Sequence, residues 1–267
     1  EPSTGSILTI TDVYLTPQGD DIRAFIRVRL SGQQENGALQ YDGAPPRLGR
    51  SLSIVTNRYE VSGQIRQVGD GSSITRDSVR VILRTRLSKA DAREMATGDE
   101  VRVAGRTVAT IDNVAVYPTG DPTESLVYLA ATLTAQQRDG QLRFAGSPIN
   151  RGQTIRLTTP EYPISGTILQ VGTGLKTATR DVLIATTVDI VTADRIAEGD
   201  TVSMAGYEAA TVESVTAYGT NNPDRTRVFV GLSLETVSTG SRQFFGSVPV
   251  QRGNPITIET VGYTLTG

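Results

Sequence analysis

Short runs of β-branched and other apolar residues alternate with polar residues along the whole chain, and Gly, Pro, Asn and Asp separate the runs. Residues 23–30 (RAFIRVRL) set apolar residues against arginine at a period of two, which is typical of a half-buried strand. Residues 126–134 and 228–235 are their equivalents later in the chain. The same criteria predict strands at residues 7–16, 51–56, 64–68, 79–87, 153–159, 167–171, 182–191 and 255–260.

Two short segments have a helical pattern instead, residues 88–96 (SKADAREMA) and 192–197 (TADRIA). Ser88 and Thr192 stand at their starts as expected N-caps, and Gly98 and Gly199 follow as expected C-terminal stops. Nearly everything else is strand. The predicted fold class is therefore all-β, with tandem small β-barrel or β-sandwich units and one short helix in each full unit.

The strand pattern repeats along the chain. Residues 80–166 align with residues 181–267 at a shift of 101 positions without a gap, and a partial copy at the front aligns at 101 and then at 103. This period is domain-sized, well above that of a solenoid repeat. We therefore expect a partial first β unit at residues 1–72, a second unit at 73–174, and a third unit at 175–267 that lacks its last strand.

Composition narrows the chemistry. The net charge is −2 and the chain has no Cys, no His and only two lysines, Lys89 and Lys176. The commonest general base, the commonest metal ligand and all thiol chemistry are absent, so we expect no enzyme, no catalytic residue, no cofactor and no metal site. No Lys/Arg run supports nucleic-acid binding, and no run of apolar residues is long enough to span a membrane. The first residue is Glu, so we expect a processed chain that has lost a signal or anchor.

Acidic or amide-rich loops follow the first strand of each unit. Their oxygens could hold calcium, but they lack the regular ligand spacing of a calcium loop, and Asx-turn chemistry accounts for them. A helix stop followed by a turn likewise accounts for the repeated Gly-Asp pairs, Gly98-Asp99 and Gly199-Asp200. The loops are Gly19-Asp20-Asp21, Gly120-Asp121-Pro122 and Asn221-Asn222-Pro223-Asp224.

Three aligned tyrosines, Tyr59, Tyr162 and Tyr263, each precede a Ser/Thr-Gly step. They could form a recognition surface, but we favour tyrosines that pack a hairpin corner and hydrogen-bond the backbone. Residues 172–177 (GTGLKT) look only faintly like a phosphate loop. No Gly precedes the Lys and a strand follows, so we predict no phosphate site there.

Three runs carry a resemblance to known families: GDEVRVAGRTVATIDNV (98–114), GDTVSMAGYEAATVESV (199–215) and GSPINRGQTIRLTTPEYPISGTI (146–168). They resemble a domain-of-unknown-function family of archaeal and cyanobacterial envelope proteins. This resemblance implies a β domain behind an N-terminal membrane anchor and brings no catalytic residues; here the domain is in tandem. The Gly-Asp runs are also similar to bacterial lipid-transport barrel domains that form hexameric rings, although no long apolar pore loop appears here.

The two ends of the repeat do not match. The third unit stops at Gly267, where its siblings continue into residues 64–68 and 167–171, and a β unit that lacks a strand has an open edge. Residues 5–10 (GSILTI) share the pattern of residues 166–171 (GTILQV). We therefore expect residues 5–10 of one subunit to fill the vacant position in the next, which makes a head-to-tail fibre. Because Thr9-Ile10 also align with Thr110-Ile111 inside the unit's own fold, either this strand serves two partners or the match with residues 166–171 is chance.

The residues expected at this contact are Gly5, Ser6, Ile7, Leu8, Thr9 and Ile10 on the donor and Tyr263, Thr264, Leu265 and Thr266 on the acceptor. The predicted function is a non-enzymatic structural protein, extracellular or at the cell surface, whose partner is itself. The alternative is an envelope lipid or small-molecule binding or transport module of the ring-forming barrel type. A closed cavity lined by Leu, Ile and Val would favour that alternative.

Overall fold

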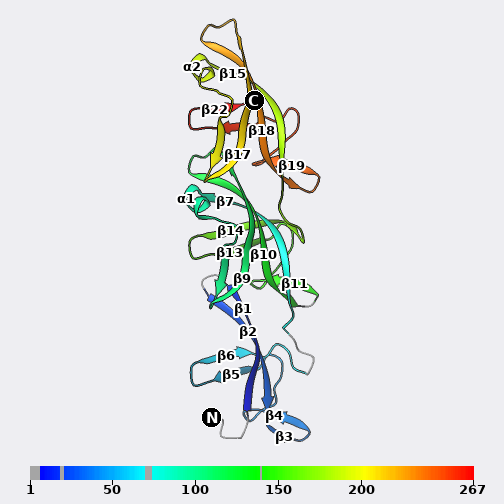
Figure 1. The fold of residues 1–267 in the computed structure, drawn as a ribbon. Helices are drawn as coiled ribbons and strands as arrows, with labels where there is room; N and C mark the ends of the chain where they lie inside the picture. Colours follow the sequence, from blue (N-terminus) through cyan, green and yellow to red (C-terminus); the bar gives the residue numbers. More distant parts are fainter. Residues whose placement is uncertain (1–6, 19–20, 70–73, 139) are drawn as a thin grey trace.

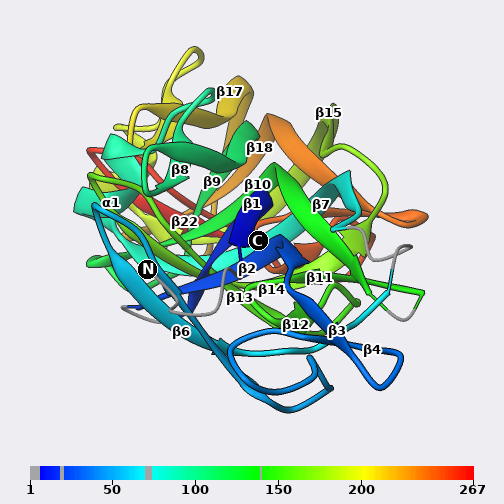
Figure 2. The same cartoon turned by 90° about the horizontal axis from the view of Figure 1, so that it is seen from below.

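The computed structural model describes residues 7–18, 21–69, 74–138 and 140–267. The fold is all-β, as the strand pattern predicts, with two short helices. Three groups of strands follow one another along an elongated molecule, as Figure 1 shows. Seen along the long axis in Figure 2, the groups overlap, so the molecule is a stack of β units.

The first unit comprises three hairpins. β1 and β2 pair over their whole length, and β3–β4 and β5–β6 form separate two-stranded sheets. Residues 65–68 follow β6 without strand geometry, so the predicted strand at residues 64–68 is wrong beyond Gln64. Ile65 still exchanges backbone hydrogen bonds with Gly49 and Arg50, but among the described residues no third strand pairs with these hairpins. The strands are β1 (Ile7–Gln18), β2 (Asp21–Ser31), β3 (Gln33–Glu35), β4 (Ala38–Gln40), β5 (Ser51–Val55) and β6 (Glu60–Gln64).

The second unit is one curled sheet in the order β12-β11-β10-β7-β14-β13. β9 lies on the other side of β10, and β8 pairs with β9. β7 is its central strand, since β10 covers one edge and the end of β14 covers the other. Its elements are β7 (Arg76–Ser88), α1 (Lys89–Glu94), β8 (Glu100–Val103), β9 (Arg106–Pro118), β10 (Glu124–Arg138), β11 (Gln141–Phe144), β12 (Ser147–Pro148), β13 (Thr154–Thr158) and β14 (Pro163–Val171).

The third unit repeats this plan with one difference. β15 pairs with β18 as β7 pairs with β10, but the hairpin β21–β22 forms a sheet of its own. The elements are β15 (Lys176–Asp189), α2 (Ile190–Ala193), β16 (Thr201–Met204), β17 (Tyr207–Gly219), β18 (Arg225–Thr239), β19 (Arg242–Phe245), β20 (Val248–Pro249), β21 (Thr257–Glu259) and β22 (Thr264–Thr266).

The helix boundaries correct part of the sequence prediction. Ser88 caps α1 as expected, since its hydroxyl accepts from the Asp91 N–H at 3.0 Å. α2 is capped by Asp189, and the Thr192 N–H donates to that carboxylate at 2.8 Å, so Thr192 is not the N-cap. A carboxylate accepts this bond at least as well as a hydroxyl, and Asp189 stands where the strand ends. Gly98 and Gly199 lie several residues beyond the helices, in turns with φ of 98° and 87°.

β-bulges fix which residues of the three units are equivalent. The register shifts at Thr11 in β1, Asp112 in β9 and Glu213 in β17, and these residues are 101 positions apart. Beyond each bulge, Asp12 pairs with Arg27, Asn113 with Ala130, and Ser214 with Gly231. A bulge bends its strand and increases the local twist, so the equivalent strand of every unit has a bend at the same place. Residues of β2 therefore correspond to residues 103 positions later in β10 and a further 101 later in β18.

Candidate assembly surfaces

The residues expected to donate a strand lie at the start of β1, at the end of the molecule that is farthest from the third unit (Figure 1). Gly5 and Ser6 lie outside the described residues. β1 uses one edge to pair with β2. In the second unit the equivalent stretch of β9 uses both edges, because Ala109 pairs with Leu133 of β10 and with Val101 of β8. The four pairs at the start of β1 are Ile7 with Ser31, Leu8 with Leu30, Thr9 with Arg29 and Ile10 with Val28.

The residues expected at the acceptor lie in and before β22. Tyr263 ends the turn, and Thr264, Leu265 and Thr266 pair with Glu259, Ile258 and Thr257 of β21. A Cβ on Gly267 would lie 3.0 Å from Ile184 Cβ, as a Cβ on Gly166 would lie 3.2 Å from Leu83 Cβ. β22 therefore approaches β15 as β14 approaches β7.

The free edge of β15 is the first candidate surface. In the second unit, residues 167–171 of β14 pair with residues 81–84 of β7. The equivalent residues of β15 are 182–185, and among the described residues only β18 pairs with this strand. Leu183 is 69% exposed, whereas its equivalent Ile82 is 1% exposed. An unpaired edge of this kind is a template for strand addition.

The second candidate surface emerges from the joints between units. We call the face of each unit that points toward the next unit its upper face and the opposite side its lower face (Figure 1). Four residues of the second unit's upper face belong to the core of the third unit: Ala115, Tyr117, Leu126 and Tyr128. The Tyr117 hydroxyl donates to Glu235 O at 3.1 Å, and the Tyr128 hydroxyl donates to Gly246 O at 2.9 Å. Burial raises the pKa of both phenols, so both stay protonated donors.

The first joint uses the same faces. The Tyr14 hydroxyl donates to Thr134 O at 3.0 Å, and Thr134 lies 101 positions before Glu235. Thr16 occupies the position of Tyr117, and its hydroxyl accepts from the Ala145 N–H at 2.9 Å. The lower face of the second unit adds charge, because Arg76 forms an ion pair with Asp12. Both joints are therefore built from the upper face of one unit and the lower face of the next.

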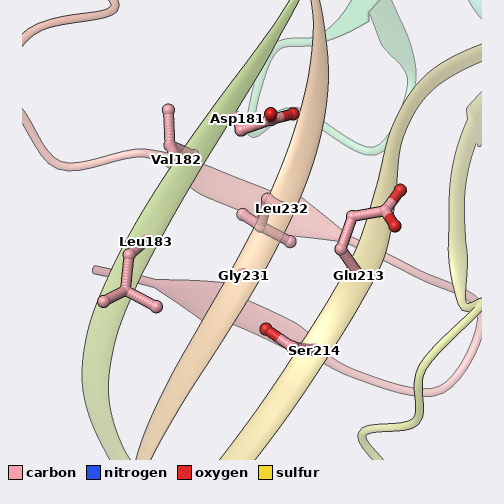
Figure 3. A pocket seen from close by; sticks show the side chains of 7 residues that line it. All are labelled: Asp181, Val182, Leu183, Glu213, Ser214, Gly231 and Leu232. Atoms are coloured by element: carbon pink, nitrogen blue, oxygen red, sulfur yellow. The ribbon is translucent and has the colours of Figure 1, made fainter.

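No other part of the described chain covers the upper face of the third unit. An open depression of about 630 Å³ crosses β15, β18 and β17, and Leu183, Gly231 and Ser214 lie side by side across it in Figure 3. A second depression of about 520 Å³ adjoins Leu183 and includes Tyr218 and Phe229, whose rings meet edge to face with centroids 5.7 Å apart. Both depressions are open to solvent, and the first is lined by the carboxylates of Asp181 and Glu213.

Sequence reasoning missed the joint tyrosines. The strand pattern does not predict that Tyr14, Tyr117 and Tyr128 lie at an interface, because a single tyrosine in a strand does not by itself indicate one. The one sequence signal is the alignment of Tyr117 with Tyr218 across the 101-residue shift, and only the structure shows that the first is 1% and the second 56% exposed.

Two of the three aligned tyrosines hydrogen-bond a carboxylate. The Tyr263 hydroxyl donates to Asp200 Oδ2, and the Tyr162 hydroxyl donates to Asp99 Oδ2. For Tyr162 and Tyr263 the hydroxyl donates to a carboxylate and not to the backbone, which corrects the expectation for these two residues, since the Asp of each Gly-Asp pair lies within reach of the hairpin corner. The corner itself is confirmed, because Thr159 and Thr260 exchange hydrogen bonds with the backbone of the tyrosine three residues on.

The acidic loops form Asx turns in the two units where they are described. Asp121 Oδ1 accepts from the Thr123 N–H at 2.8 Å, and Asn222 Oδ1 accepts from the Asp224 N–H at 2.9 Å. Residues 19–20 of the first loop lie outside the described residues. Within the described ranges, no group of three acidic residues lies close enough together to bind a metal ion.

In the part of the chain that the structure describes, no helix is long and apolar enough to cross a membrane. Comparisons with protein-family models, with curated proteins and with solved structures gave no match. The resemblances drawn from the Gly-Asp runs therefore stay predictions.

Proposed function

We propose that this chain is a structural protein that assembles head to tail into a filament by β-strand addition. In this assembly, residues 5–10 of one copy pair with the free edge of β15 in the next copy. The observation that carries the proposal is the difference between β7 and β15. β7 has strands on both edges, whereas the described residues supply β15 with a strand on one edge only.

Among the residues that the structure describes, the donor has a free edge as well. Residues 7–10 pair with β2 along one edge of β1, and the precedent of β9 supports a second partner on the other. A strand has hydrogen-bonding groups on both edges, so donation does not require β1 to leave β2. The contact joins different surfaces of the two copies, and such contacts produce an open filament unless the rotation closes a ring.

We place this filament outside the cell or at its surface, on the basis of the cysteine-free, Thr- and Gly-rich composition. The alternative, an envelope lipid or small-molecule module, requires an enclosed apolar cavity. The two depressions described above are open and partly polar, so they favour the filament.

Electron microscopy and sedimentation velocity of the purified chain test the proposal. We expect filaments from the full chain and monomers from a variant without residues 1–10. That deletion also removes pairs from the β1–β2 ladder, so circular dichroism has to show that the fold persists. An excess of the peptide GSILTI, added to the full chain, should shorten the filaments, whereas the same residues in scrambled order should not. Normal filaments from the folded deletion variant would overturn the proposal.

A further inference from the structure

We infer that the upper face of the third unit binds the lower face of the first unit of a second copy, through the contacts that join units within the chain. This inference rests on the proposed head-to-tail assembly and names a second interface in the same joint. The strand contact involves backbone at the β15 edge. The face contact involves the side chains of Tyr218, Phe229 and Arg227.

The upper faces of the first two units are both covered. Tyr14 and Thr16 are buried by the second unit, and Tyr117 and Tyr128 by the third. The equivalents in the third unit are Thr216, Tyr218 and Phe229, and Tyr218 is 56% exposed. Contiguous exposed aromatic and aliphatic side chains mark an interaction site, and here the chain itself shows twice what covers this site.

The lower face of the first unit contains a backbone turn equivalent to the turn that the first unit's upper face contacts at the first joint. In the second unit the Ala145-Gly146 turn approaches the first unit, with φ of 51° and 79°. The equivalent turn in the first unit, 103 positions earlier, is Asp42-Gly43, with φ of 52° and 70°. The flanking pairs agree, since Tyr41 bridges Ala44 as Phe144 pairs with Ser147. The turn is therefore preformed, and a preformed surface lowers the entropic cost of binding.

A hydrogen bond to a strand carbonyl recurs at both joints. Thr134 O accepts from Tyr14, and Glu235 O accepts from Tyr117. The equivalent carbonyl on the first unit's lower face belongs to Ser31, which is exposed at the end of β2 and pairs with Ile7. The Tyr218 hydroxyl is placed to donate to Ser31 O of the second copy. Ile7 begins the proposed donor strand, so the two contacts lie side by side.

Charge complements the fit. At the first joint Arg23 Nη1 lies 2.7 Å from the position that a Cβ on Gly146 would take, so this guanidinium lies against the turn. Its equivalent in the third unit is Arg227, which also lies over the Phe229 ring at 5.3 Å. The turn that would face Arg227 contains Asp42 rather than Ala145. Opposite charges at equivalent positions favour this pairing of ends over the pairing of like ends.

Charge exchange tests the inference on the full chain. Arg227→Glu faces Asp42 of the next copy with a like charge, and we expect association to weaken at least about tenfold in sedimentation equilibrium. Asp42→Arg should do the same, and the double variant R227E/D42R should restore association. These residues belong to the third and first units, so the two changes meet only where one copy contacts another.

Arg252→Glu is the matched control, because its equivalent Arg151 stays exposed although the second unit has neighbours on both sides. Tyr218→Ser is a second disrupting variant that leaves the charges alone, should a charge variant fail to fold.

The outcomes separate the two interfaces when amide hydrogen exchange of the assembled protein is measured as well. If each single charge variant loses association and the double variant recovers it, the face contact is supported. This holds whether or not the amides of residues 182–185 are protected. If those amides stay unprotected while the charge variants behave in this way, strand addition is wrong and the face contact stands. If filaments form and both single charge variants and Tyr218→Ser assemble like the control, the face contact is wrong and strand addition stands. A full chain that stays monomeric overturns both.

Discussion

The hydroxyl of Tyr263 donates a hydrogen bond to Asp200 Oδ2 at 2.6 Å and so joins the β21–β22 hairpin to the turn that follows α2. The same carboxylate oxygen accepts from the Ala197 N–H at 2.9 Å, which closes that turn. Tyr162 and Asp99 repeat the arrangement in the second unit. Each full unit thus has one side-chain contact that connects its last hairpin to its helical segment, 63 residues apart in sequence.

Removal of this contact should destabilise the third unit. Tyr263→Phe keeps the ring and removes the donor, and hydrogen bonds to charged groups contribute about 1.5–3 kcal/mol. We expect the free energy of unfolding from urea titration to fall by that order. Tyr59→Phe is the control, because Tyr59 is 50% exposed and the described residues hold no equivalent of Asp200 in the first unit. An equal loss in both variants would contradict this account.

The threonine of the hairpin corner should matter only where it is buried. Thr159 is 5% exposed, and its hydroxyl accepts from the Tyr162 N–H and donates to Tyr162 O, both at 3.0 Å. Thr56 makes the same two bonds to Tyr59 in an exposed turn. Thr159→Val leaves a buried N–H without its partner, which costs about 1–3 kcal/mol, whereas water can replace the hydroxyl of Thr56. Thermal melts of Thr159→Val and Thr56→Val should therefore differ, with the larger decrease for Thr159→Val.

Stability should fall in alkaline solution. Burial, and then the hydrogen bond and charge of Asp200, raise the pKa of Tyr263 above its ordinary value of about 10 in the unfolded chain. Between these two values the unfolded chain has lost the proton and the folded chain has kept it. The contribution is therefore complete below about pH 10 and is lost as the pH rises toward the folded pKa. Urea midpoints from pH 8 upward should decline for the native chain and less steeply for the double variant Y162F/Y263F.

The fold could be predicted largely from local patterns, because period-two alternation and the 101-residue repeat both arise from strands with one buried face. The position of Asp189 as N-cap could not be predicted so readily, since Thr192 offers an equally suitable side chain until the end of β15 is known. Residues 65–68 have a strand pattern but no strand. A strand needs a partner, and the first unit contains no equivalent of β7 among its described residues.

The candidate surfaces were only half accessible to sequence reasoning. The open edge of β15 follows from aligning the repeats, because the alignment shows which partner strand belongs there. The joints depend on the twist of each sheet. This twist turns Tyr117 and Tyr128 toward the next unit, whose contacting residues are far away in the sequence. Equivalent residues then acquire different environments, and the residues next to Tyr218 in the sequence do not show that its environment differs from that of Tyr117.

This difference yields a prediction for two residues at one structural position. Tyr117→Ala removes a ring that is packed against Phe245 at 5.5 Å and a hydroxyl bonded to Glu235 O, so we expect a loss of about 3–5 kcal/mol, typical of large buried side chains. Tyr218→Ala at a protein concentration too low for assembly should change stability by less than about 0.5 kcal/mol, because its ring is mostly exposed. At concentrations where filaments form, Tyr218→Ala should lower stability as well, since this variant removes a contact between copies. Melting temperatures measured across a dilution series check both statements. A Tyr218→Ala variant whose melting temperature follows that of the native chain at every concentration would contradict the second.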